Sequence, residues 1–117
     1  MEYSGIKVVA SPITLNDLRQ IAKLTFGDMV KIVVDLEKRI MAVGGELHAD
    51  EEAMLLDQGS EQKNLWGANI YVNQPRESWF EFDSMINIRP SQGNRSRNIT
   101  DENVRKQVSE IAYSLIK

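Results

Sequence analysis

The chain contains no cysteine, which excludes a disulfide framework, a thiolate nucleophile and a thiolate metal site. It has a single histidine, His48, which argues against a zinc site built from several imidazoles. It also has no basic excess, because 17 acidic residues outnumber 14 basic ones and the formal net charge is -3. This balance argues against a protein whose whole surface attracts nucleic acid or an anionic membrane.

Long apolar runs are absent as well. No segment approaches the ~18 apolar residues of a membrane span, and the first residues lack the basic and apolar regions of a secretory signal. We therefore expect a cytoplasmic protein with no membrane partner. The chain has 117 residues, of which 42% are hydrophobic and 26% charged, and this predicts one globular domain over residues 1–117.

Three segments carry apolar residues at helical spacing. The first begins after Thr14, a good N-cap that has Asp17 three residues further on. The second begins at about Asp50, which we predict as its cap, and ends at about Gln58. The third follows Thr100 and continues to the end of the chain.

Strands are predicted between these helices. β-branched residues fill residues 29–44 on both sides of a turn, which indicates a hairpin. A second hairpin joins residues 65–72 to an alternating strand that starts at Phe80 and extends to Arg89, while residues 6–10 fit a short strand or an arm. Because hairpins pair antiparallel, we predict an α+β fold with a four-stranded antiparallel sheet and helices mainly on one face. The predicted order is helix, hairpin, helix, hairpin, helix.

Three sequence strings resemble a family of small prokaryotic proteins of unknown function. They are GGELHADEEAMLL at residues 44–56, NLWGANIYV at residues 64–72 and FDSMINIRPSQGNRSR at residues 82–97. The resemblance covers most of the chain and implies no activity, substrate or cofactor. It does imply a shared site, because it is best at polar residues that a core alone would not require. These residues are Glu46, His48, Asp83, Arg89, Asn94 and Arg95.

The loop at residues 89–97 is the first candidate site. Its arginines can bind phosphate or carboxylate in a forked geometry, and Gly93 allows backbone N–H groups to turn inward. The loop also leads into the N-terminus of the last helix, an end that favours anions. We expect an anionic ligand here, such as a phosphate-bearing small molecule or a nucleic acid; the alternative is a solvated loop whose arginines pair with carboxylates. The predicted ligand-binding residues are Arg89, Asn94, Arg95 and Arg97.

The second candidate site consists of Glu46, His48 and Asp83. Carboxylates and an imidazole can act as general acid and base or hold a divalent metal, so this set predicts a hydrolase or nuclease. The spacing gives little support, because Glu46 and His48 do not form an HExxH motif. The alternative is that Asp83 pairs with an arginine and His48 is a hydrogen-bonded structural residue. Nothing in the sequence predicts a resident metal or cofactor.

The third hypothesis is a protein interaction or oligomerisation module. A sheet with helices mainly on one face leaves its other face or an edge open to a second subunit. Polar and apolar residues alternate on the predicted open face, for example Lys31, Val33 and Tyr71. A homo-oligomer is therefore a further expectation.

Overall fold

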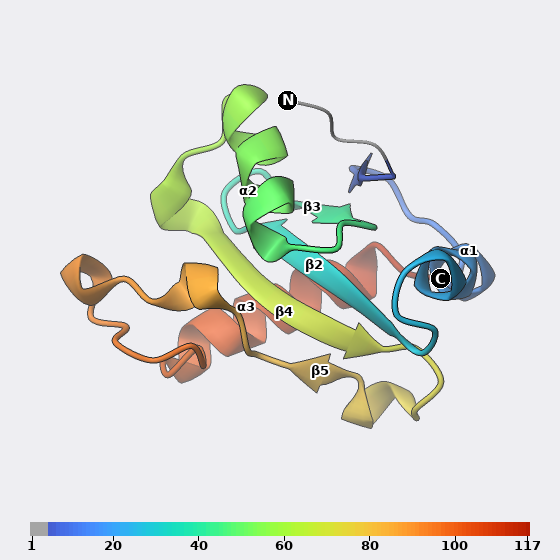
Figure 1. The fold of residues 1–117 in the computed structure, drawn as a ribbon. Helices are drawn as coiled ribbons and strands as arrows, with labels where there is room; N and C mark the ends of the chain where they lie inside the picture. The colour runs from blue at the N-terminus through green and yellow to red at the C-terminus, as the bar shows by residue number, and fades with distance from the viewer. Residues whose placement is uncertain (1–4) are drawn as a thin grey trace.

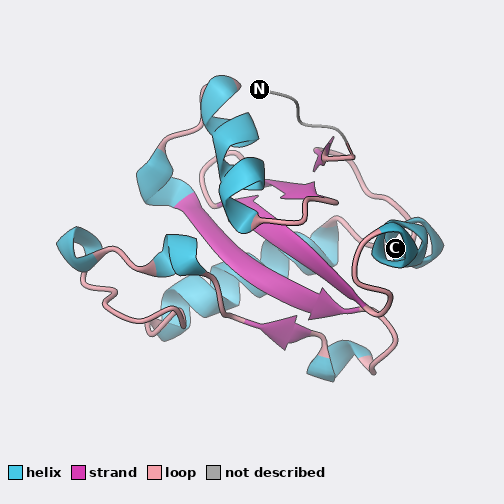
Figure 2. Cartoon of the chain, in the orientation of Figure 1, coloured by secondary structure: helices cyan, strands magenta, loops and turns pink. Residues whose placement is uncertain are grey.

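The centre of the protein is a five-stranded antiparallel sheet in the order β1-β3-β2-β4-β5 (Figure 1, Figure 2). This is seen in a computed structural model that describes residues 5–117. The strands are β1 (Lys7–Val9), β2 (Met29–Asp35), β3 (Ile40–Val43), β4 (Leu65–Tyr71) and β5 (Phe80–Glu81). The helices are α1 (Leu15–Leu24), α2 (His48–Asp57) and α3 (Glu102–Ser114). None of the helices in residues 5–117 has the length and apolar character needed to cross a membrane.

The predicted α+β class and the antiparallel sheet are confirmed, but the number and order of elements are corrected. The sheet has five strands instead of four, because β1 pairs with β3 along the edge of the sheet. The order therefore begins with a strand, and short 3-10 helices lie between the longer elements. Two of these, η3 (Met85–Asn87) and η4 (Pro90–Gln92), occupy residues that the sequence pattern assigned to a strand and a loop.

Local hydrogen bonds explain why α1 and the first hairpin form where the sequence predicts them. Thr14 caps α1 by accepting the Asp17 N–H at 3.0 Å, and the Asp17 carboxylate accepts the Thr14 N–H in return. In the β2–β3 turn, Oδ1 of Asp35 accepts the N–H groups of Glu37 and Lys38, each at 2.9 Å. This aspartate stabilises a turn that lacks an Asn-Gly or Asp-Gly pair.

Two helices, α1 and α3, cover one face of the sheet, as the prediction of helices mainly on one face has it, and α2 covers the other face. The main core lies against α1 and α3, where it includes Leu18, Ile32 and Ile111. A second, smaller core lies on the opposite face, where Val33 of the sheet packs with Leu55 of α2. Figure 1 shows α2 in front of the sheet and α3 behind it. Both faces need cover because successive residues of β2 are apolar and buried, so both sides of that strand are hydrophobic.

The strand predicted from Phe80 to Arg89 is wrong beyond Glu81, because the side chain of Asn87 replaces the backbone as the pairing partner of β4. The Gly67 N–H donates to Oδ1 of Asn87, and Nδ2 of Asn87 donates to the Gly67 carbonyl, both at 2.9 Å. Asn87 is completely buried. A Cβ at position 67 would lie 2.7 Å from the side chain of Ser84, so only glycine permits this approach.

Replacing Asn87 with Asp tests this pairing. A carboxylate retains the shape of the amide but cannot donate to the Gly67 carbonyl, and it buries a charge. We expect the free energy of unfolding to fall by about 3 kcal/mol, measured by urea denaturation. The same exchange at the exposed turn residue Asn73 should change it by less than about 0.5 kcal/mol. Equal unfolding midpoints for the two variants would contradict the role of Asn87.

Candidate functional site

Arg89 is used by the fold. Its side chain is buried, its guanidinium donates to the carbonyl oxygens of Gln62 and Leu65, and it stacks 4.1 Å from the centre of the Trp66 ring. Burial lowers the pKa of Arg89 from its usual value, and the charge of Glu52 partly offsets this. Arg89 therefore ties its loop to the start of β4 and is not available to a ligand.

Asn94 is used by the loop itself. Its Nδ2 group lies 2.8 to 3.0 Å from the carbonyl oxygens of Asn87, Ser96 and Asn98. Its Oδ1 accepts both the N–H and the hydroxyl of Thr100. Both polar atoms of this buried side chain are satisfied, so Asn94 holds the loop closed.

The remaining two predicted ligand residues, Arg95 and Arg97, have different surroundings. Arg95 is exposed, and no hydrogen bond or ion pair joins it to another described residue. The nearby N-terminus of α3 is also closed, because Oδ1 of Asp101 accepts the N–H groups of Asn103 and Val104. Arg97 lines one pocket, whereas Asn94 lines a different one beside Trp66 and Thr100. The four predicted residues therefore do not form one site.

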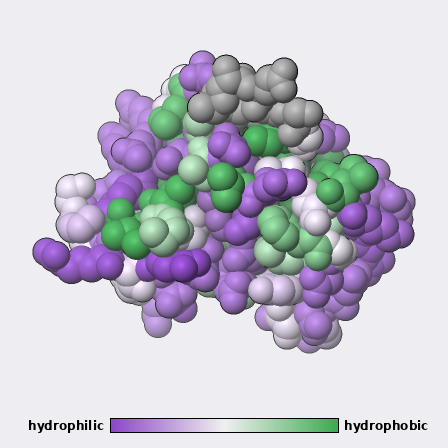
Figure 3. Space-filling model, viewed as in Figure 1, coloured by the Kyte–Doolittle hydropathy of each residue, from purple (hydrophilic) through white to green (hydrophobic). Residues whose placement is uncertain are grey.

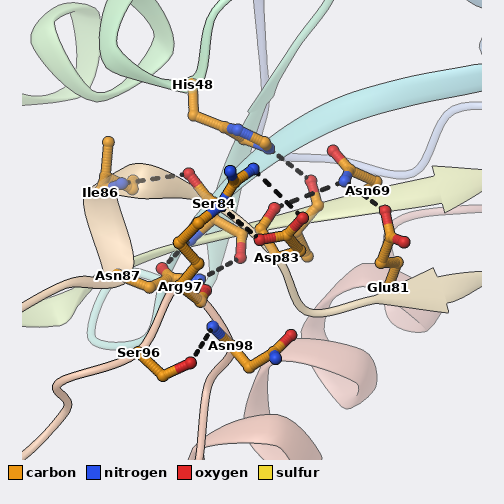
Figure 4. Close-up of polar contacts among 12 residues, drawn as sticks. His48, Asn69, Glu81, Asp83, Ser84, Ile86, Asn87, Ser96, Arg97 and Asn98 are labelled. Carbon is orange, nitrogen blue, oxygen red and sulfur yellow. Dashed lines mark hydrogen bonds and ion pairs between the residues drawn. The ribbon is translucent and has the colours of Figure 1, made fainter.

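The pocket that Arg97 reaches has a volume of about 250 Å³ and lies between α2, the sheet and η3 (Figure 4). We call it the α2 pocket. It brings Arg97 together with His48 and Asp83 from the second predicted set, whereas Glu46 lines a different pocket beside Asp50. The polar side chains that line the α2 pocket are Lys31, His48, Asn69, Asp83, Ser84 and Arg97.

Asp83 and Arg97 form a forked ion pair at this pocket. Nε of Arg97 lies 2.9 Å from one carboxylate oxygen of Asp83, and Nη2 lies 3.3 Å from the other. The backbone sets this geometry, because the Ser84 N–H donates to the Arg97 carbonyl and the Ile99 N–H donates to the Phe82 carbonyl. Asp83 thus pairs with an arginine, as the alternative hypothesis for this residue held.

His48 is neutral and has one ring nitrogen free. Its Nε2 lies 2.8 Å from the Ala68 carbonyl, which only accepts, so Nε2 carries the proton and Nδ1 is an acceptor. Burial lowers the pKa of His48 to about 4, and the hydrogen bond to Ala68 only partly offsets this effect. At neutral pH Nδ1 is therefore an acceptor, and no hydrogen bond to this atom is seen among residues 5–117; the ring also interacts with the side chain of Asn69, which raises its pKa.

Asn69 presents a second free acceptor. Its Nδ2 donates to Oε1 of Glu81 at 2.8 Å and also approaches the Asp83 carbonyl at 3.4 Å. Because both of these partners only accept, the orientation of the amide is fixed and Oδ1 faces the other way. Among residues 5–117 no donor makes a hydrogen bond of good geometry to this buried oxygen, which lies beside the ring of His48 (Figure 4). The interaction of Asn69 with this ring raises the pKa of His48. Sequence patterns could not reveal this residue, because its role depends on Glu81 of the neighbouring strand.

The N-terminus of α2 opens into the same pocket. The helix begins at His48, so the prediction that Asp50 caps it is wrong; the residue at the cap position is Leu47, which has no side chain able to cap. The N–H groups of His48 and Ala49 have no partner in the described part of the chain. Both residues and Leu47 line the pocket. An uncapped helix start carries a partial positive charge that favours anions.

Glu51 is a buried acid in the first turn of α2. One of its oxygens accepts the Gly45 N–H at 3.0 Å, and the other has no partner. A Cβ at position 45 would lie 2.8 Å from the Glu51 side chain, which explains the need for a glycine there. Burial raises the pKa of Glu51 well above its ordinary value, so the folded protein favours the neutral acid. The Gly44-Gly45 pair was the only sequence signal of this contact.

Within residues 5–117, no group of three or more His, Asp or Glu side chains is arranged to hold a metal ion. Glu46, which the metal hypothesis needs beside His48 and Asp83, lines the other pocket. The metal-dependent version of the hydrolase hypothesis therefore lacks a set of ligands in this structure.

Fold and site together define an α+β protein with a small, positively biased pocket at an uncapped helix start. The chain matches the model of the family described as Protein of unknown function (DUF5674) over residues 7–115, and it belongs to that family. This match confirms the resemblance seen in the sequence. Comparison of the chain with curated proteins and with solved structures found no match.

Alanine substitutions separate the two neighbouring arginines. Arg89→Ala should lower the free energy of unfolding by about 2–4 kcal/mol, because it leaves the Gln62 and Leu65 carbonyls without their donor and opens a cavity. Arg95→Ala removes an exposed side chain and should change it by less than about 0.5 kcal/mol. Chemical denaturation measures both. Similar losses in the two variants would show that Arg89 does not have the structural role assigned to it.

Replacing Glu51 with Gln tests its protonation through the pH dependence of stability. The unfolded chain releases the Glu51 proton near its ordinary pKa of 4.5, whereas burial keeps the folded protein protonated to higher pH. Wild-type stability should therefore fall as the pH rises above that value, until the folded carboxyl also ionises. Gln removes this loss, so the variant should melt at a higher temperature than wild type at about pH 8 and at a similar one at about pH 4.

The control for this experiment is Glu77→Gln at an exposed position. It should leave the difference in melting temperature between the two pH values as it is in the wild type. If the melting temperature of the Glu51→Gln protein depends on pH in the same way as that of the wild type, Glu51 is ionised in the folded state.

Proposed function

We propose that this protein binds a small anionic ligand in the α2 pocket. The observation that carries the proposal is the uncapped start of α2, where the free N–H groups of His48 and Ala49 lie at a pocket that also contains Lys31 and Arg97. Helix starts bind phosphate and carboxylate groups in this manner. The proposal keeps the anion-binding function expected from the sequence but moves it from the 89–97 loop to the pocket, and Arg97 is the residue common to both.

The charges of the pocket support an anion. Lys31 has no ion-pair partner among residues 5–117, and its ammonium lies 5.4 Å from the centre of the Phe26 ring. Arg97 shares its charge with Asp83 but keeps Nη1 free. Two cations and one carboxylate leave these side chains with a net charge of +1. Because the site is partly buried, this charge is screened less than it would be on an open surface.

The hydrolase hypothesis has less support than anion binding. Its three residues do not lie together, since Glu46 is in the other pocket. The proton of His48 is engaged by the Ala68 carbonyl, and the carboxylate of Asp83 is engaged by Arg97. Neither His48 nor Asp83 is therefore free to act as the acid or base that this hypothesis assigns to it.

A thermal-shift experiment tests the proposal with a panel of anions: inorganic phosphate, small carboxylates, nucleoside phosphates and a short RNA. A ligand that binds only the native state raises the melting temperature, with about 2.7 kcal/mol of stabilisation at a hundred times its Kd. We expect a shift for wild type and none for Lys31→Met, which keeps the apolar stem of the side chain but removes its charge.

Arg95→Ala is the matched control, because it removes one positive charge close to Arg97 in sequence but outside the pocket. It should retain the wild-type shift. An equal shift in all three proteins would place binding elsewhere on the surface. The absence of a shift with every anion in the panel would refute an anion site.

A further inference from the structure

Resting on the proposed anion site, we propose that the ligand is a small carboxylate that carries a neutral hydroxyl or amide N–H beside the carboxylate and an apolar side chain. This assignment follows from three properties of the α2 pocket: its net charge, its unpaired acceptors and its size and rim.

The net charge favours a ligand with a single negative charge. Nε and Nη2 of Arg97 are already bound to Asp83, so Lys31 supplies the one uncompensated charge, assisted by the N–H groups at the start of α2. A carboxylate matches this charge. A phosphate monoester carries about 1.5 to 2 negative charges at neutral pH and would leave an excess beside the Asp83 carboxylate.

The unpaired acceptors require a hydrogen-bond donor on the ligand. Oδ1 of Asn69 is buried and receives no hydrogen bond from the described residues, and the amide cannot be turned around because its nitrogen donates to Glu81. Nδ1 of His48 is a second acceptor, because Nε2 holds the proton against the Ala68 carbonyl. A buried acceptor without a donor costs free energy, and an anion alone cannot satisfy it.

The donor should be neutral. A ligand ammonium would enter a pocket that already contains the charges of Lys31 and Arg97. Asp83, the one carboxylate among the described residues that line the pocket, is paired. A hydroxyl or an amide N–H donates equally well to Asn69 and His48 without this repulsion. The pocket thus selects a hydroxy acid or an N-acylated amino acid over a free amino acid.

The size and rim of the pocket define the rest of the ligand. A volume of about 250 Å³ corresponds to about eight water molecules at ~30 Å³ each, which suits a molecule of the size of an amino acid. Leu47 and Met85 line the pocket although these residues are 58% and 64% exposed. Hydrophobic surface is visible on this face of the protein among hydrophilic side chains (Figure 3). An apolar group of the ligand would cover these two residues.

Calorimetric titration of the full chain with probes on one carbon skeleton tests the assignment. Leucic acid has a carboxylate and a hydroxyl, isocaproate lacks the hydroxyl, leucine has an ammonium in its place, and N-acetylleucine has an amide N–H. We expect leucic acid or N-acetylleucine to bind about tenfold more tightly than isocaproate, as one additional hydrogen bond to a buried acceptor predicts. Leucine and inorganic phosphate should bind more weakly than the better of these two probes.

The variant Asn69→Ala removes the acceptor. The ratio of the affinities for the donor-bearing probes to the affinity for isocaproate should therefore fall toward one, while isocaproate still binds. If this variant fails to fold, the affinities of the wild type for the probes decide whether the ligand assignment holds. Equal affinities of wild type for isocaproate and both donor-bearing probes, or tighter binding of leucine or phosphate, would overturn this ligand assignment and leave the anion site standing. If neither the carboxylates nor phosphate binds, the proposed function fails together with it.

Discussion

The paired hydrogen bonds between the Asn87 amide and the Gly67 backbone are the constraint on which the candidate site depends. They hold η3 against β4 at Gly67. Nδ2 of Asn87 also donates to the carbonyl of Arg97. This third bond fixes the backbone of the loop at Arg97, close to its end. Asp83 and Arg97 consequently face each other at the pocket, next to His48 of α2.

The structure separates polar groups that serve the fold from polar groups that remain available. Arg89 and Asn94 are buried and bonded to backbone carbonyls, so they stabilise the loop between β5 and α3. Oδ1 of Asn69 and the first N–H groups of α2 make no hydrogen bond within residues 5–117, and they meet at one pocket. Because proteins satisfy nearly all of their buried polar groups, such a convergence is a stronger sign of a binding site than a cluster of arginines.

The uncompensated charge of the pocket has a structural origin on the α2 side of the sheet. Burial lowers the pKa of His48 and raises that of Glu51, and both shifts favour the neutral form of the side chain. Both shifts therefore act against a charge on these two groups, which lie near Lys31. Of the described residues that line the pocket, Asp83 is the one carboxylate that opposes the positive charges of Lys31 and Arg97.

The sequence by itself determined the elements that depend on neighbouring residues, and only the tertiary structure decided the roles of the polar residues. The Thr14 and Asp17 cap and the apolar spacing of α3 act over a few positions, so the pattern predicts them correctly. The partners of Arg89 are 27 and 24 residues away along the chain, and no local pattern shows that they remove it from solvent. Likewise, Oδ1 of Asn69 is left as an acceptor only because Glu81 of the neighbouring strand binds the amide nitrogen.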